Sequence, residues 1–170
     1  RHHGGQELVS RRVEGDIHRY TYRDLARRAR QLAKAVAALG VQPGDRVATM
    51  AWNGYRHMEL YYAVGGCGSV LHTLNPRLHA EQLAWIADDA QDQVLFFELS
   101  FLPAIEAVAS RLKSVRHFVL MTDRAHMPAS TLPLLCYEDL VEAQDDRFEW
   151  PDFDENTASS LCYTSGTTGN

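Results

Sequence analysis

Between residues 21 and 40, apolar side chains recur at intervals of three and four, and basic side chains lie between them. This spacing predicts an amphipathic helix from Tyr22 to Leu39, because residues at these intervals share one helix face. Thr21 and Asp24 resemble a capping box, and Gly40 is well placed to end the helix. The apolar face would consist of Leu25, Ala29, Leu32, Val36 and Leu39, and the basic face of Arg23, Arg27, Arg30 and Lys34.

The rest of the chain alternates short apolar runs with further segments of helical spacing. A turn at Pro43 and Gly44 precedes the first apolar run, and Asn75 with Pro76 ends the second. Strands are predicted over residues 46–50, 70–74, 93–98, 116–121 and 158–163. Helices are predicted from Tyr55 up to three closely spaced glycines, and over residues 79–89, 101–112 and 138–143.

Alternation of apolar strands with amphipathic helices is typical of βαβ units. Parallel strands need crossover helices and are buried on both faces, which explains why these strands are apolar throughout. The predicted fold class is therefore α/β, with a largely parallel sheet. Residues 122–156 are less regular and more acidic, and "WPDFDENTAS" is typical of a surface linker into the last strand.

The composition is that of an ordinary soluble domain, with 170 residues, of which 45% are hydrophobic and 23% charged. The apolar runs are too short to span a bilayer, so the cytoplasm is the expected location. Cys67, Cys136 and Cys162 are odd in number and widely spaced, which indicates reduced thiols rather than disulfides or a zinc site. The chain starts at Arg1 and stops within an apparent functional loop, so we expect a fragment whose sheet needs further segments or a partner to cover it.

The net charge of −5 conceals a basic region at the start of the chain. Residues 1–60 contain 11 Lys and Arg against 6 Asp and Glu, whereas residues 61–170 contain 6 against 16. A basic helix face could bind nucleic acid, but a solvated surface above an apolar stripe is the common explanation. We therefore expect no nucleic-acid partner. A homodimer is one possible oligomeric state.

The chain ends in "LCYTSGTTGN", a loop of hydroxyl groups and glycines behind a short strand. Freed backbone N–H groups and hydroxyl donors suit phosphate oxygens, although a loop without a ligand has the same composition. The loop is not a Walker A motif, because only two residues separate Gly166 from Gly169. It is not a nucleophile elbow around Ser165, because Tyr163 and Thr167 stand where glycines are required.

The run "YTSGTTGN" resembles the phosphate-binding signature of the adenylate-forming superfamily, which includes acyl-CoA synthetases, peptide synthetase adenylation domains and luciferases. Upstream, "HRYTYRDLARRARQLAKAVAALGVQPGDRVATMAWN" is similar to the N-terminal region of these enzymes. The stretch "RHMELYYAVGGCGSVLHTLNPRL" most resembles medium- and long-chain fatty acyl-CoA ligases. The resemblance covers most of the chain, and residues 122–155 carry little of it.

The resemblance implies a two-step reaction, in which a fatty acid attacks ATP to give an acyl-adenylate and CoA then displaces AMP. It implies ATP, Mg²⁺ and CoA as co-substrates or cofactors, and an incomplete adenylation domain over residues 1–170. It assigns binding of the ATP phosphates to Thr164, Ser165, Gly166, Thr167, Thr168 and Gly169. The catalytic lysine and the Mg²⁺ ligand lie downstream in the family, so no catalytic or metal residue is assigned and the chain alone is expected to be inactive.

Two alternatives to a fatty acid ligase remain open. One is an adenylating enzyme for another carboxylic acid, such as an aryl or amino acid, because the acyl pocket is not in this sequence. The other is a nucleotide- or phosphate-binding module without catalysis, which requires that the chain be a complete gene product.

Four other features invite a functional interpretation. Cys67 in "GGCGS" is predicted to be a packed small hydrophobe at a close contact between helix and sheet rather than a nucleophile. His72 could lie near the nucleotide or acyl channel, but packing is favoured. Asp152, Asp154 and Glu155 are expected to form a solvated acidic turn rather than a cation site. Core area is expected from the aromatic side chains of Trp52, Trp85, Trp150, Tyr61 and Tyr62.

Overall fold

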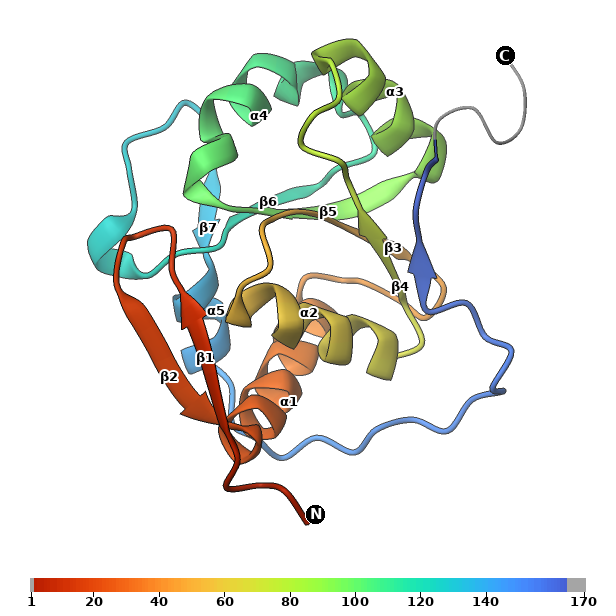
Figure 1. Cartoon of the computed structure of the whole chain (residues 1–170). Coiled ribbons are helices and arrows are strands. Elements are labelled where there is room, and N and C mark those ends of the chain that lie inside the picture. Colours follow the sequence, from red (N-terminus) through yellow and green to blue (C-terminus); the bar gives the residue numbers. More distant parts are fainter. Residues whose placement is uncertain (1, 165–170) are drawn as a thin grey trace.

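The computed structural model describes residues 2–164, and a six-stranded sheet forms its centre (Figure 1). Its strands are β3 (Arg46–Met50), β4 (Val70–Thr73), β5 (Asp92–Phe97), β6 (His117–Leu120), β7 (Leu134–Cys136) and β8 (Ser160–Leu161). They lie in the order β7-β6-β5-β3-β4-β8, and every neighbouring pair is parallel. The predicted α/β class with a largely parallel sheet is confirmed.

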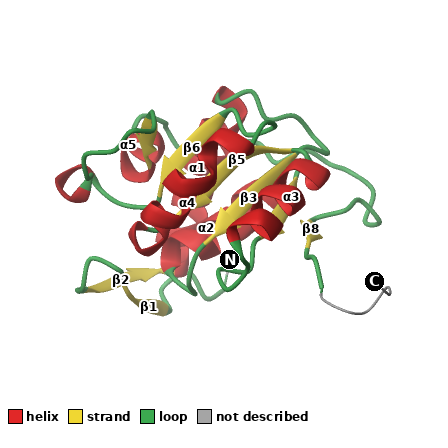
Figure 2. Cartoon of the chain, turned by 90° about the horizontal axis from the view of Figure 1, so that it is seen from above, coloured by secondary structure: helices red, strands yellow, loops and turns green. Residues whose placement is uncertain are grey.

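Helices cover both faces of this sheet, as Figure 2 shows from above. They are α1 (Tyr22–Ala38), α2 (Tyr55–Gly66), α3 (Ala80–Ala90), α4 (Leu102–Val108) and α5 (Tyr137–Glu142). Side chains of α1, α2 and α5 pack on one face, and side chains of α3 and α4 pack on the other. Among residues 2–164, no helix combines the length and apolar character needed to cross a bilayer.

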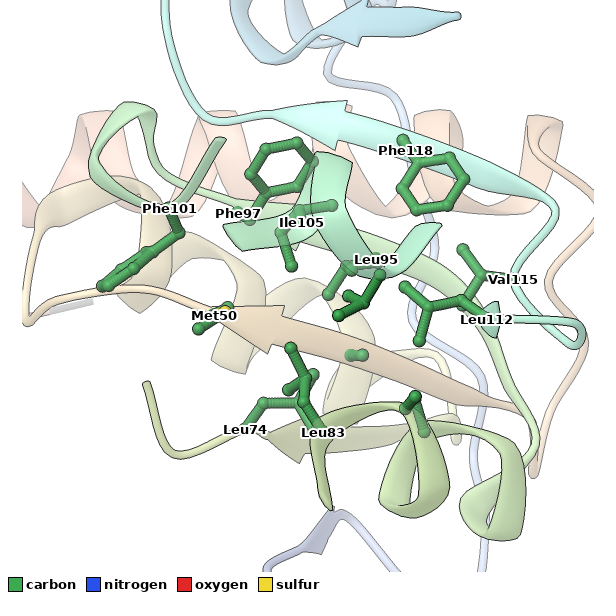
Figure 3. Close-up of a cluster of buried hydrophobic side chains, with 14 of the residues drawn as sticks. Met50, Leu74, Leu83, Leu95, Phe97, Phe101, Ile105, Leu112, Val115 and Phe118 are labelled. Carbon is green, nitrogen blue, oxygen red and sulfur yellow. The ribbon is translucent and has the colours of Figure 1, made fainter. Parts of the chain in front are cut away.

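The core between the sheet and helices α3 and α4 combines strand side chains with side chains of these helices and their connections (Figure 3). Leu95, Phe97 and Ile105 are exposed by 1% or less of their surface. Burial of each such side chain contributes about 1.5–3 kcal/mol to stability. This core fixes α3 against the sheet, and α3 supplies two of the side chains near the candidate site.

Helix α1 follows the predicted pattern closely. The Thr21 hydroxyl accepts from the Asp24 backbone N–H at 3.3 Å, and the Asp24 carboxylate accepts from the Thr21 N–H at 3.0 Å, which completes the capping box. The stripe from Leu25 to Val36 is buried. On the basic face, Lys34 contacts Asp145 at 2.8 Å and Arg30 donates to the Asp146 carbonyl at 2.9 Å, so the acidic linker pairs with part of this charge.

Several elements were not predicted from the sequence. Strands β1 (Glu7–Arg11) and β2 (Ile17–Thr21) form a separate antiparallel hairpin, and β7 lies within the segment predicted to be irregular. The predicted helix over residues 101–112 is interrupted, because α4 is flanked by the 3₁₀ turns Leu99–Phe101 and Ala109–Arg111. Strands β1 and β2 mix polar and apolar residues, and β7 has only three residues, so these strands give too few positions for a periodic signal.

The prediction that five aromatic side chains supply core area is wrong. Their exposed fractions range from 40% to 62%. In α2, the core-facing positions belong to Leu60, Ala63 and Val64, so the residues between them face outward. The exposed set consists of Trp52 (52%), Tyr61 (49%), Tyr62 (53%), Trp85 (62%) and Trp150 (40%).

The glycines that end α2 were predicted to allow close contact between helix and sheet, but Gly66 instead faces the linker. A Cβ atom on Gly66 would lie 2.5 Å from the Trp150 ring. We expect Gly66→Ala to displace Trp150 and to cost about 1 kcal/mol of stability, because a half-exposed ring can move away. The measurement is the urea midpoint of the full-length protein, with Trp150 fluorescence taken as the difference from a Trp150→Phe variant.

Gly65→Ala is the matched control for that experiment. Its Cβ would approach only the Ser159 side chain, at 3.9 Å, and alanine favours a helix more than glycine does. Gly65→Ala should leave Trp150 fluorescence unchanged and stability equal or higher. Equal losses in the two variants would contradict the packing of Trp150 on Gly66.

Candidate functional site

The predicted phosphate loop leaves the sheet beside the carboxyl end of β4. Strand β8 runs parallel to β4, with Leu71 opposite Ser160 and His72 opposite Leu161. The Leu71 N–H donates to the Ser159 carbonyl at 3.0 Å and extends this pairing. In open α/β sheets, ligands bind outside the carboxyl ends of the strands, so the loop begins at the edge where a ligand is expected (Figure 2).

Of the six predicted phosphate-binding residues, the structure describes one. Thr164 is exposed and follows β8 by three positions. Ser165, Gly166, Thr167, Thr168 and Gly169 lie outside the described residues. The assignment of these six residues to the ATP phosphates therefore remains a prediction.

Tyr163, the residue before the loop, is anchored to helix α3. Its hydroxyl donates to the Asp89 carboxylate at 2.5 Å, and its ring meets the Trp85 ring edge-on with centroids 6.3 Å apart. Burial, assisted by the Asp89 carboxylate, raises the pKa of Tyr163 to about 12. Tyr163 is therefore protonated at neutral pH and remains a hydrogen-bond donor.

His72 lies in β4, and its side chain is fully buried, as the favoured packing role predicts. Its Nδ1 atom lies 2.9 Å and 3.0 Å from the two carboxylate oxygens of Asp92. Burial raises the pKa of Asp92, and the His72 contact opposes that effect. The His72 ring lies 5.3 Å from the Tyr163 ring, which brings this pair to the base of the loop.

A polar group at the carboxyl end of β5 was missed from the sequence. Glu98 follows β5 and is 7% exposed, and its carboxylate accepts from the Trp52 backbone N–H at 3.2 Å. This contact joins the loops after β3 and β5, which lie side by side in the sheet but whose following helices cover opposite faces. Burial raises the pKa of Glu98. The sequence did contain a signal for Glu98, because an acidic residue directly follows the apolar strand β5.

The cysteine and acidic candidates behave as packing and surface groups. Cys67 packs against the core, and burial raises the pKa of its thiol to about 11, so the thiol is protonated and unreactive at neutral pH. Asp152, Asp154 and Glu155 are exposed, and the Asp154 carboxylate accepts from the Asn156 N–H at 2.8 Å. The expected solvated turn is confirmed.

The described carboxylates near Tyr163 do not form a site for the Mg²⁺ that the resemblance implies. Asp89 lies closest to Tyr163 and already accepts its hydroxyl, so residues 2–164 offer no ligand set for the ion there. Elsewhere, Glu14, Asp123 and His126 bring ligand atoms within 4.8 Å of one another. Arg56 contacts Glu14 and Arg12 contacts Asp123, and these cations oppose metal binding.

Comparison with known proteins identifies the family. The AMP-binding enzyme family matches residues 1–170. The chain belongs to this family. It is 51% identical over 170 residues to 3-methylmercaptopropionyl-CoA ligase of Ruegeria lacuscaerulensis, covering 99% of this chain and 32% of that protein. It is 47% identical over 171 residues to medium-chain-fatty-acid–CoA ligase of Ectopseudomonas oleovorans, covering 100% of this chain and 31% of that protein.

Solved structures of other proteins share this fold. The fold matches an anthranilate CoA ligase in complex with anthranoyl-AMP, with a TM-score of 0.81, 24% identity, and coverage of 89% of this chain and 28% of that one. At this identity, the likeness shows the fold alone. The chain spans about a third of the length of its AMP-binding relatives. The resemblance to adenylate-forming enzymes is thus confirmed at the level of the family.

Proposed function

We propose that the full-length protein containing this chain converts a carboxylic acid into its CoA thioester at the expense of ATP. The observation that carries the proposal is the match of residues 1–170 to AMP-binding enzymes, together with a hydroxyl- and glycine-rich sequence that directly follows strand β8 of a parallel sheet. Residues 1–170 form the first part of the adenylation domain, and the acyl pocket and catalytic lysine belong to the remainder. The reaction uses the ATP and CoA of the cytoplasm.

The chemistry follows from the weakness of a carboxylate as an acyl donor. The carboxylate oxygen attacks the α-phosphorus of ATP, the bond to the bridging oxygen breaks, and pyrophosphate leaves with the displaced electron pair. The CoA thiol then attacks the acyl carbon and AMP leaves. Residues Thr164–Gly169 bind the β- and γ-phosphates through hydroxyl and backbone N–H donors and stabilise the charge that moves onto pyrophosphate.

Mg²⁺ supplies additional charge neutralisation on the phosphates when it is bound. Its ligands belong to the part of the protein after Asn170 in this proposal. Tyr163 and the side chains around it hold the start of the loop, and this is the contribution of the described residues to catalysis.

A medium- or long-chain fatty acid is the proposed substrate. The support is the stretch "RHMELYYAVGGCGSVLHTLNPRL" and the 47% identity to a medium-chain-fatty-acid–CoA ligase. A short thioether acid is the second candidate, because the relative that is 51% identical is a 3-methylmercaptopropionyl-CoA ligase. An apolar pocket discriminates by about 1–3 kcal/mol per methylene, so a series of acids can separate the two.

The substrate experiment measures kcat/KM for thioester formation by the full-length protein with saturated acids of increasing length and with 3-methylmercaptopropionate. We expect an optimum at medium or long chains. An optimum at 3-methylmercaptopropionate supports the second candidate and contradicts the first. Binding of ATP without turnover of any acid would instead indicate a module without catalysis.

A further inference from the structure

The His72–Asp92 pair spans three strands of the sheet. His72 is in β4 and Asp92 starts β5, and β3 lies between these strands. Ala48 of β3 is the residue opposite His72 in the parallel register. A small side chain there leaves room for the imidazole and the carboxylate to meet across β3, at 2.9 Å.

This pair holds the imidazole in one orientation within the core. Both side chains have 0% exposure, and the Nδ1 atom of His72 lies within hydrogen-bond distance of both carboxylate oxygens of Asp92. The other ring nitrogen, Nε2, is buried and has no hydrogen-bond partner among the described residues. A histidine that served packing alone would be expected to have both nitrogens satisfied.

The oriented ring supports the residue from which the loop departs. Tyr163 lies against three groups: the His72 ring at 5.3 Å, the Trp85 ring at 6.3 Å and the Asp89 carboxylate at 2.5 Å. Trp85 and Asp89 are one helical turn apart in α3, so they present one face to Tyr163. The direct neighbour of Tyr163 along the chain is Thr164, the first residue of the predicted phosphate loop.

We propose that His72 is a positioning residue for the start of the phosphate-binding loop: Asp92 fixes its ring, and the ring supports Tyr163, the residue before Thr164. This inference rests on the proposed function, because it assigns His72 a part in ATP binding. Positioning matters for phosphate transfer, since small displacements of binding groups reduce rate and affinity strongly.

The test is His72→Asn in the full-length protein. Asparagine can still donate to Asp92 in place of Nδ1, so the buried carboxylate keeps a partner, but the ring against Tyr163 and Nε2 are lost. We expect the KM for ATP in acid-dependent pyrophosphate exchange to rise about tenfold, equivalent to about 1.4 kcal/mol, while the KM for the acid stays within about twofold. ATP should also protect residues 158–170 from hydrogen exchange less than in the wild-type protein.

His57→Asn is the matched control. His57 is also buried, but both of its ring nitrogens have partners, Thr49 at 3.0 Å and the Trp52 carbonyl at 3.2 Å. The variant should lower the melting temperature without a selective change in the KM for ATP. Parallel increases in the KM values for ATP and acid in His72→Asn, or an ATP KM equal to that of the wild type, would overturn the proposal.

Tyr163→Ala provides a second variant that leaves the buried pair intact, so it decides the matter if His72→Asn does not fold. The same selective increase in the KM for ATP is expected, and an unchanged value would contradict the proposal. A wild-type protein without exchange activity for any acid would count against the proposed function itself. Wild-type exchange with normal ATP binding in both variants would count against the role of His72 alone.

Discussion

Replacing Arg28 with methionine is expected to lower the free energy of unfolding by about 3–5 kcal/mol, because the buried Glu59 carboxylate loses its cation and Glu138 keeps only Arg56. Arg28 Nε donates to Glu59 at 2.7 Å, and Arg28 Nη2 donates to Glu138 at 2.8 Å. The Glu59 side chain is fully buried. These contacts join α1 to α2 and α5, so the loss reaches all three helices on one face of the sheet.

The destabilisation of Arg28→Met should grow as the pH rises. Burial raises the pKa of Glu59, and the Arg28 guanidinium opposes this increase. Removing Arg28 raises the folded-state pKa further above the unfolded value. Stability linked to a raised carboxyl pKa is present at low pH and lost as the pH rises, so the deficit should be smaller at about pH 5 than at about pH 8.

Arg27→Met is the control for the buried ion pairs. Arg27 contacts only Gln31 among the hydrogen bonds and ion pairs of the described residues, at 2.9 Å. A change within about 0.5 kcal/mol is expected. Urea unfolding of the full-length variants at the two pH values provides the measurement. Equal losses in Arg27→Met and Arg28→Met would show that the buried pairs do not stabilise the fold as described.

The second large effect concerns activity. Replacing Thr167 and Thr168 together with valine is expected to reduce kcat for acid-dependent pyrophosphate exchange by about 10²–10³, because loss of a donor to developing charge commonly has this effect. Valine keeps the shape of threonine but removes the hydroxyl. The melting temperature should stay close to that of the wild type, because the hydroxyl donors are assigned to phosphate rather than to the core.

Thr157→Val serves as the control for loss of a hydroxyl group. Thr157 is exposed in the linker before β8, and its backbone N–H donates to the Asp154 carbonyl at 2.9 Å. This variant should retain full activity. Full activity in the double variant as well would remove the phosphate-binding assignment from Thr167 and Thr168.

The sequence predicted the elements whose periodicity is long and regular. Helix α1 was predicted because seventeen residues repeat one pattern and Thr21 caps them with Asp24. The central strands were predicted because burial on both faces requires continuous apolar runs. The hairpin of β1 and β2 was not predicted because its strands mix polar with apolar residues, and β7 was not predicted because three residues are too few for a periodic signal.

The candidate site was predicted only in part, because some of its contacts join residues that are far apart in the sequence. The loop has a local composition that suggests phosphate binding, so the sequence alone indicated it. The pair of His72 and Asp92 joins residues twenty positions apart across an intervening strand, and Glu98 contacts Trp52 across 46 positions. Such contacts follow from strand order, which periodicity does not specify. The aromatic residues were misplaced because hydrophobicity alone does not say whether a helix or loop side chain faces the core.

The most direct test of the central claim is acid-dependent exchange of labelled pyrophosphate into ATP by the full-length protein. The exchange reports formation of the acyl-adenylate without CoA, so it isolates the step assigned to the loop at Thr164–Gly169. We predict exchange that requires both ATP and a carboxylic acid, with the highest rate for a medium- or long-chain fatty acid. No exchange with any acid, from a folded protein that binds ATP, would contradict the claim that this chain belongs to an acid-activating enzyme.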